Sequence, residues 1–412
     1  MYHDHHLHPL GYASLVTGLE LMDAADLGEV LERVARRADQ VDGPIIGQRL
    51  NDEAIAELRL PTATDIDDFI ADRPVLLYRY CGHIAVANSA ALRLAGVDSD
   101  TPDPAGGVID RASSGEPTGV LRETAVPLVS QALAPLIPAP SDSDLLAALA
   151  GLPEMGIGSI TGIISVGEPV WCGVSDELET LIRLAPDLPL DIEVLVIAGT
   201  PAELQNAADR INQTDGRLRF HGWKEFSDGS LGGHTAAMHE PYADRTDTRG
   251  TDRLNPPHAI EMSGVALDLG GAVAIHAIGD RANDSVLDVF AQLLSDGADP
   301  GSLRIEHASI LTDQAIERMG RMGVTASVQP AFLVSEETWL EKRLGADRMD
   351  LAYPFRSLTE AGVPLLGGSD SPVELPDPEV GINAAVDRHG INPGQALTRE
   401  QAEKLFSVEK GA

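Results

Sequence analysis

The sequence predicts an α/β protein built on a (β/α)8 TIM-type barrel, and two observations lead to this prediction. Strand-like runs alternate with helical patterns after residue 156, as in parallel sheets joined by helical crossovers. An extended segment at the start of the chain raises the count of strand-like segments to eight, the number in such a barrel. The predicted strands are His3–His8, Ile157–Ile163, Leu190–Ile197, Leu218–Phe226, Ala272–His276, Leu303–Glu306, Val324–Val328 and Pro364–Leu366.

Helices are predicted between these strands because apolar residues recur there every three to four positions. A final helix is expected near the end of the chain, at Leu397–Phe406. The helical patterns that separate the strands include Ala202–Ile211, Asp280–Leu294, Asp313–Met322 and Arg356–Ala361.

Residues 40–140 are predicted to be a large insertion after the first strand that covers the mouth of the barrel. Gly, Pro and Asp are frequent in residues 98–120, which predicts a surface loop there. The other elements expected in or beside the insertion are strands at Pro44–Gly47 and Val75–Tyr80 and helices at Asp26–Arg37, Val86–Ala95, Thr118–Leu133 and Ser143–Met155.

The amino-acid composition excludes several classes of binding partner and favours one location. The net charge of −34 argues against nucleic acid and anionic membranes, and no run approaches the 18 apolar residues of a membrane span. Two cysteines are too few for a disulfide framework, which favours a cytoplasmic location. Only four of the 30 basic residues are lysines, and this acidic, arginine-rich composition favours a halophilic source. A homo-oligomer is left open.

Polar residues follow the apolar runs of several predicted strands. Barrel enzymes place their chemistry at the carboxyl ends of the strands, and residues two apart in a strand share a face. Two alternative interpretations exist: the first histidines could belong to a histidine-rich N-terminal tail, or single histidines could be hydrogen-bonded residues of the core. Both explain the pattern less well because several such residues occur at strand ends. The residues are His6, His8, Lys224, His276, His307 and Asp370.

Six motifs together resemble the amidohydrolase superfamily, and within it amidohydrolase family 3, the group that contains N-substituted formamide deformylases. That family has a small β-sandwich domain in addition to the barrel, and we expect this domain to be mostly or wholly absent from the present chain. The motifs are His6–Gly11, Gly82–Leu92, Lys224–Gly232, His276–Ala282, Arg304–Ala308 and Gly368–Glu374.

The resemblance implies a metal centre. Its ligands would be His6, His8, His276, His307 and Asp370, and a carboxylated Lys224 would bridge two ions. Imidazole and oxygen ligands suit one or two Zn²⁺ ions, with another divalent metal as the alternative. A metal-bound water supplies hydroxide near neutral pH, and Asp370 would carry its proton to the leaving amine.

Two further residues are predicted to contact substrate. His83 would act from the insertion, although a hydrogen-bonded loop histidine explains it equally well. Asp228 follows the fourth strand and is an equal candidate for a turn or for support of a ligand.

We therefore expect residues 1–412 to form a metal-dependent hydrolase that cleaves a C–N, amide-type bond of a small molecule. A cyclic-imide hydrolase or a deaminase with the same metal centre is the alternative among enzymes. A truncated barrel that binds or regulates without catalysis is the alternative outside them. The identity of the substrate does not follow from the sequence, because specificity resides in loop geometry.

Overall fold

A computed structural model describes residues 1–104, 106–137, 140–166 and 176–407 of the chain. These residues form two compact units, each with its own β-sheet. The first unit joins Met1–Pro9 to most of the chain after Leu146, and the second contains Leu10–Leu145. None of the helices in the described ranges has the length and apolar character that a bilayer crossing demands.

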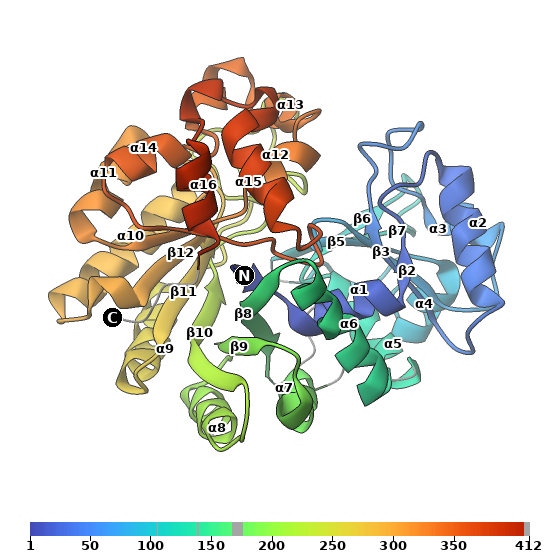
Figure 1. Cartoon of the computed structure of the whole chain (residues 1–412). Helices are drawn as coiled ribbons and strands as arrows, with labels where there is room; N and C mark the ends of the chain where they lie inside the picture. Colours follow the sequence, from blue (N-terminus) through green and yellow to red (C-terminus); the bar gives the residue numbers. More distant parts are fainter. Residues whose placement is uncertain (105, 138–139, 167–175, 408–412) are drawn as a thin grey trace. The chain divides into compact units, whose positions relative to one another are not determined.

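The first unit is a barrel of eight parallel strands in the order β1-β8-β9-β10-β11-β12-β13-β14. The sheet closes because Leu7 forms a parallel bridge with Ser371, and the Asp370 N–H donates to the His6 carbonyl at 2.7 Å. The predicted (β/α)8 TIM-type barrel is thus confirmed (Figure 1). The strands are β1 (Tyr2–Leu7), β8 (Ile157–Ser165), β9 (Asp191–Ile197), β10 (Leu218–Phe226), β11 (Ala272–Ala277), β12 (Leu303–His307), β13 (Thr325–Val328) and β14 (Leu365–Gly367).

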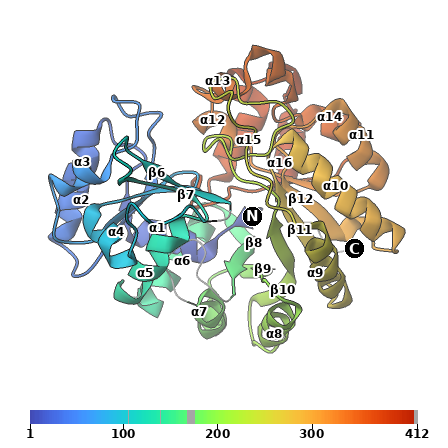
Figure 2. The same cartoon turned by 180° about the vertical axis from the view of Figure 1, so that it is seen from behind.

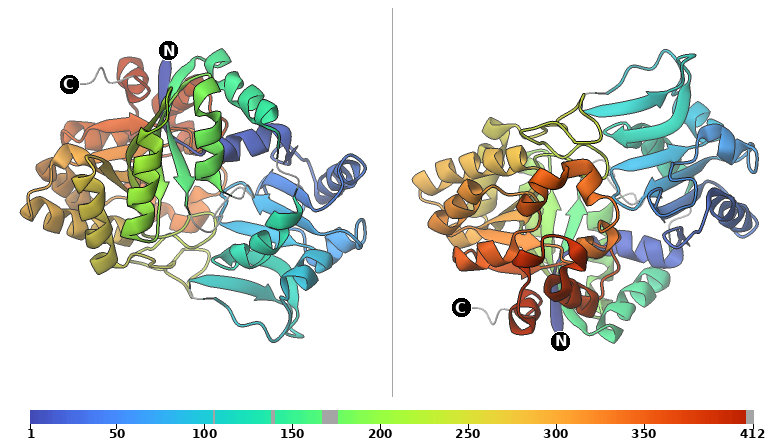
Figure 3. Two further views of the ribbon diagram at one scale, coloured as in Figure 1. Left: turned by 90° about the horizontal axis from the view of Figure 1, so that it is seen from below. Right: turned by 90° about the horizontal axis from the view of Figure 1, so that it is seen from above.

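Helices surround the barrel strands, as Figures 2 and 3 show from other directions. Inside the barrel, Ile163, Leu195 and Ala274 form a small apolar cluster from three different strands. The helices of this part of the chain are α6 (Asp142–Glu154), α7 (Glu177–Leu184), α8 (Pro201–Asn212), α9 (Pro256–Asp268), α10 (Asp280–Ser295), α11 (Asp313–Met322), α12 (Phe332–Ser335), α13 (Leu340–Leu344), α14 (Phe355–Glu360), α15 (Pro378–Asp387) and α16 (Arg399–Leu405).

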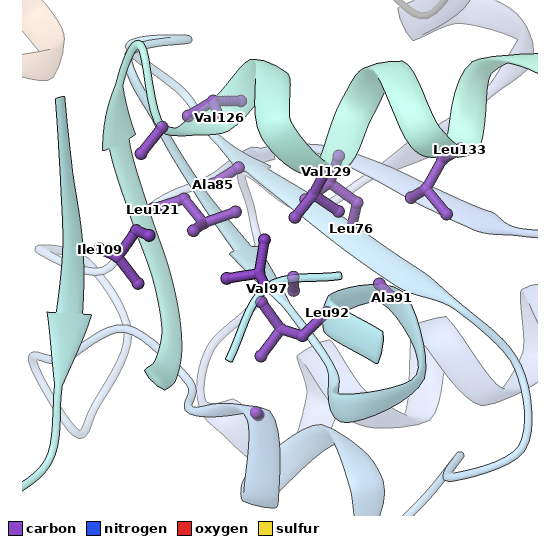
Figure 4. Close-up of a cluster of buried hydrophobic side chains, with 13 residues drawn as sticks. Leu76, Ala85, Ala91, Leu92, Val97, Ile109, Leu121, Val126, Val129 and Leu133 are labelled. Atoms are coloured by element: carbon purple, nitrogen blue, oxygen red, sulfur yellow. The ribbon is translucent and has the colours of Figure 1, made fainter. Parts of the chain in front are cut away.

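The second unit is a six-stranded mixed sheet in the order β2-β3-β4-β5-β7-β6, with helices packed against it. Its core includes Leu76, Leu121, Val129 and Leu133, which come from two strands and one helix (Figure 4). The predicted insertion, residues 40–140, lies within this unit. The elements are α1 (Pro9–Thr17), β2 (Leu19–Glu20), α2 (Leu27–Ala38), β3 (Ile45–Leu50), α3 (Ala63–Asp67), β4 (Val75–Arg79), β5 (Ile84–Ala87), α4 (Ser89–Ala95), β6 (Gly107–Arg111), β7 (Pro117–Glu123) and α5 (Val126–Leu133).

Three local predictions in this unit were wrong. The helix expected over Val86–Ala95 begins only at Ser89, because Asn88 caps it by accepting a hydrogen bond from the Ala91 N–H at 3.0 Å. The residues expected as loop at 98–120 contain β6 and the start of β7, which pair antiparallel. For the same reason, the helix expected over Thr118–Leu133 is a strand in its first part.

The acidic surface predicts a stability that increases with salt. We expect the free energy of unfolding to rise between about 0.1 M and 1 M KCl, since the screening length falls from about 10 Å to about 3 Å. Repulsion among 64 acidic and 30 basic residues then weakens. Exposed ion pairs such as Arg356–Glu360 weaken too, but each contributes under about 1 kcal/mol. Urea unfolding followed by circular dichroism measures this, and a lower stability at 1 M salt would contradict it.

Candidate metal centre

Three side chains with metal-binding atoms converge at the carboxyl ends of the barrel strands. His6 lies in β1, His8 directly follows that strand, and Asp370 follows β14. One ligand atom from each lies within 4.8 Å of the other two, and all three residues are buried. Asp370 Oδ1 is 3.1 Å from His6 Nε2 and 3.3 Å from His8 Nε2. The predicted ligands from the first and last strands therefore meet.

The chemistry of this donor set fits a divalent ion. Ligand atoms about 2.0–2.1 Å from a tetrahedral Zn²⁺ lie roughly 3.3 Å from one another, close to the distances found here. Two imidazoles and one carboxylate also leave a fourth position open. Burial opposes the charge on Asp370, but the contacts with His6 outweigh it and hold the pKa of this carboxyl well below its usual range. Asp370 is therefore an anion at neutral pH, as a ligand must be.

The backbone around these ligands explains how they come together. The side chains of His6 and His8 lie two residues apart on an extended strand. Gly368 lies so close to this strand that a Cβ at position 368 would be 2.6 Å from the backbone nitrogen of His6. Asp4 accepts hydrogen bonds from the backbone N–H of His6 at 3.0 Å and of Ser369 at 3.1 Å. Asp4 thus links the two chain segments that carry the ligands.

A buried carboxylate that the sequence pattern did not identify orients His6. Glu306 Oε2 is 2.5 Å from His6 Nδ1, and Glu306 Oε1 accepts a hydrogen bond from Arg304 Nε at 2.5 Å. Burial opposes the charge on Glu306, but Arg304 and His6 hold the pKa of its carboxyl well below the ordinary value. A His6 ring that donates from Nδ1 to Glu306 presents the lone pair of Nε2 to a metal.

Glu306→Gln is therefore expected to lower the metal affinity about 10- to 100-fold, the usual effect of removing the partner of a ligating histidine. The amide cannot balance the charges of both Arg304 and His6. Competition with a chromophoric chelator measures the affinity. Glu177→Gln is a matched control, because Glu177, the first residue of α7, is another buried carboxylate and accepts hydrogen bonds from the Ser165 backbone N–H and hydroxyl rather than from a metal ligand. An unchanged affinity in Glu306→Gln would contradict the proposed support of His6.

His276 and His307 lie next to this cluster. The His307 ring centroid is 4.9 Å from that of His6 and 4.4 Å from that of His276. His307 Nδ1 lies 2.7 Å from Gln329 Oε1, so a buried amide orients His307 as Glu306 orients His6. Within the described residues, however, only His6, His8 and Asp370 form a group of three donors within 4.8 Å of one another. The metal-binding role of His276 and His307 stays a prediction.

Lys224 is a buried side chain of β10, only 1% exposed. Its Nζ lies 3.7 Å from the centre of the Phe226 ring and donates to the Glu225 carbonyl at 3.3 Å. Burial lowers the pKa of Lys224 to about 8, although Glu306 and Asp370 act in the opposite direction. A neutral amine is thus accessible near physiological pH, as carboxylation requires, and the carboxylated form stays a prediction.

The two predicted substrate contacts are buried and have partners. Asp228 accepts hydrogen bonds from the backbone N–H of Ala237, Ile278 and Gly279, at 2.8 to 3.1 Å. Asp228 Oδ1 also lies 3.3 Å from His276 Nε2. The turn-forming role and the support of a ligand, both left open by the sequence, are therefore both compatible with this geometry. His83 Nδ1, in the second unit, lies 2.9 Å from Glu123 Oε2. Contact of either residue with substrate stays a prediction, as does the covering of the barrel mouth by the insertion.

A barrel with histidines and an aspartate gathered at its strand ends defines a class of metal-dependent barrel enzymes. Comparison with protein-family models gives the particular family. The model described as the amidohydrolase family matches residues 3–410, so the chain belongs to the amidohydrolase family. The resemblance to amidohydrolase family 3 is thereby confirmed. Membership of this family supports hydrolase activity, and the similar structures of metal-dependent hydrolases support a metal at the site.

Individual relatives agree with this assignment. A putative amidohydrolase of Bacillus subtilis, YtcJ, is 34% identical over 98% of this chain and 77% of its own length. An N-substituted formamide deformylase of Arthrobacter pascens is 27% identical over 93% of this chain and 73% of its own. The crystal structure of an uncharacterized metal-dependent hydrolase from Pyrococcus furiosus superposes with a TM-score of 0.72 at 32% identity, covering 98% of this chain and 80% of that one.

Proposed function

We propose that this protein hydrolyses a C–N, amide-type bond of a small molecule with a divalent metal held by His6, His8 and Asp370. The observation that carries the proposal is the buried cluster of these three side chains at the strand ends. One relative is named an N-substituted formamide deformylase, which supports an N-formyl or other N-acyl amine as substrate. Zinc is the proposed ion, with other divalent metals as alternatives.

A divalent ion bound there supplies Lewis acidity and makes water nucleophilic near neutral pH. Hydrolysis breaks the C–N bond, adds the water oxygen to the acyl carbon and delivers a proton to the departing nitrogen. We assign that proton transfer to Asp370, which accepts the proton as a carboxylate and then donates it to the amine. Its low pKa keeps it in the carboxylate form at neutral pH.

We also propose a second ion, held by His276, His307 and a carboxylated Lys224. The support is the short distance between the imidazole rings of His276 and His307, 4.4 Å between centroids, and the burial of the Lys224 amine near Asp370 and Glu306. Buried amines lose their charge readily, and a neutral amine is the form that takes up carbon dioxide.

Metal content and a substrate screen test the proposed function together. We expect one to two equivalents of metal by elemental analysis, loss of activity on chelation, and release of an amine from an N-formyl or N-acyl amine panel. Release of ammonia would instead indicate a deaminase, and ring opening without a released fragment would indicate a cyclic-imide hydrolase. A protein that binds no metal at micromolar concentration would overturn the proposal and leave a non-catalytic binding barrel.

A further inference from the structure

A pocket lies at the amino-terminal ends of the barrel strands, which is the end opposite to the His6–His8–Asp370 cluster. Its cavity of about 410 Å³ is lined by the first residues of several strands. Three arginines and three histidines contribute to the lining, against two carboxylates, Asp191 and Glu193. The lining side chains therefore carry one more positive than negative charge, in a chain whose net charge is −34, and they bring several hydrogen-bonding groups together.

A buried arginine forms part of the pocket wall. Arg304 is 4% exposed and lines the cavity. Its Nε is paired with Glu306, and its Nη2 donates to the His5 carbonyl at 2.7 Å and to Ser327 Oγ at 3.3 Å. None of these three hydrogen bonds uses the third nitrogen, Nη1. The guanidinium is thus held in a fixed orientation with one nitrogen still able to bind a ligand.

The rest of the wall favours a small polar ligand. Arg217 and Arg219 lie exposed at the amino-terminal end of β10 and line the pocket. Arg217 Nε lies 4.0 Å from Asp191 Oδ1, and its Nη1 donates to the Pro189 carbonyl at 2.9 Å. Burial, followed by the charge of Arg304, lowers the pKa of His221 to about 4, so this imidazole is neutral at pH 7 and acts as a hydrogen-bonding group. A cavity of about 410 Å³ accommodates a small ligand.

We propose that this pocket binds a small oxyanion, with a carboxylate or phosphate group placed against Arg304 and attracted by Arg217 and Arg219. Guanidinium groups match the planar geometry of oxyanions and form the stronger, charge-assisted class of hydrogen bond. The Arg304 side chain needs little reorganisation, because Glu306, Ser327 and the His5 carbonyl already hold it. The lining contains none of His6, His8 and Asp370, although Arg304 shares Glu306 with His6. The proposal does not depend on the proposed hydrolysis.

Isothermal titration with inorganic phosphate and with succinate, at constant ionic strength set with chloride, tests the proposal. We expect saturable binding of at least one of them by the wild-type protein, and at least about tenfold weaker binding by Arg217→Gln/Arg219→Gln. The matched control is Arg321→Gln/Arg356→Gln, which removes the same charge from exposed residues of α11 and α14 and should bind within about twofold of wild type.

The two probes and the variants separate the outcomes. Binding of phosphate alone identifies a phosphoryl ligand, and binding of succinate alone identifies a carboxylic acid. If phosphate binds at the metal centre instead, the Arg217→Gln/Arg219→Gln variant will have the same affinity for phosphate as the wild type. That result would overturn the proposal. Absence of saturable binding of both probes to the wild type would also overturn it. If circular dichroism shows that the double variant is unfolded, the His221→Gln variant is tested in its place. This variant keeps every arginine, and we expect it to bind the anion at least about tenfold more weakly than the wild type.

Discussion

Replacing Asp370 with asparagine is expected to lower kcat about 10²- to 10⁴-fold, the usual contribution of general acid–base catalysis. Asparagine keeps the size of the side chain and an oxygen that can face His6 and His8, so the fold and much of the metal content should persist. It cannot accept a proton at neutral pH. The wild-type side chain is a carboxylate at neutral pH, because the contacts with His6 overcome the effect of burial and hold its pKa low, and a carboxylate oxygen can take up the proton.

The measurement is kcat on the best amide substrate, together with metal content by elemental analysis. Asp347→Asn is the matched control, since Asp347 is exposed, and the same change there should leave kcat and metal content at wild-type values. If Asp370→Asn keeps its metal and turns over at nearly the wild-type rate, Asp370 is not the proton carrier. Loss of metal with loss of activity would instead assign it the role of ligand alone.

The barrel could be predicted from the sequence because most of its strands are short, mainly apolar runs bounded by helical patterns. The predicted strand Leu218–Phe226 and helix Asp313–Met322 have the bounds found in the structure. The second unit was harder to predict. Strand β5 is buried throughout and lacks alternation, so its residues read equally well as the start of a helix. In β6, Val108 is 46% exposed, and an outer strand of this kind carries little apolar signal.

The candidate site could be predicted in part. His6, His8 and Asp370 follow from one general rule, that barrel chemistry lies at the carboxyl ends of the strands. Glu306 and Gln329 were missed because their partners, His6 and His307, are 300 and 22 residues away in the sequence. Only the folded barrel shows these pairs. The signal available for Glu306 was a charged residue in a strand expected to be buried, because a buried carboxylate needs a partner.

Substitution of Lys224 tests the proposal that the site holds a second metal ion. Lys224 is one of four lysines in a chain that otherwise uses arginine, and of the three lysines that the structure describes it is the one in a barrel strand. A lysine that served only as a salt-bridge partner could be replaced by arginine with little loss. Arginine stays charged at all accessible pH values, however, and cannot form a carbamate. Because the pKa of Lys224 is about 8, a fraction of its side chain is a neutral amine near neutral pH. This form reacts with carbon dioxide to give a carbamate and a proton.

Lys224→Arg is therefore expected to bind at least one metal equivalent fewer than the wild type and to lose activity with it. A permanent cation in place of an anionic bridge repels the ion at short range. Lys404→Arg is the control, because Lys404 is exposed and pairs with Glu400 one helical turn away. Because an arginine at a fully buried position can disturb packing, Lys224→Met, which has similar length and no charge, should show the same metal loss. Full metal content and activity in a folded Lys224→Arg variant would leave only the salt-bridge role.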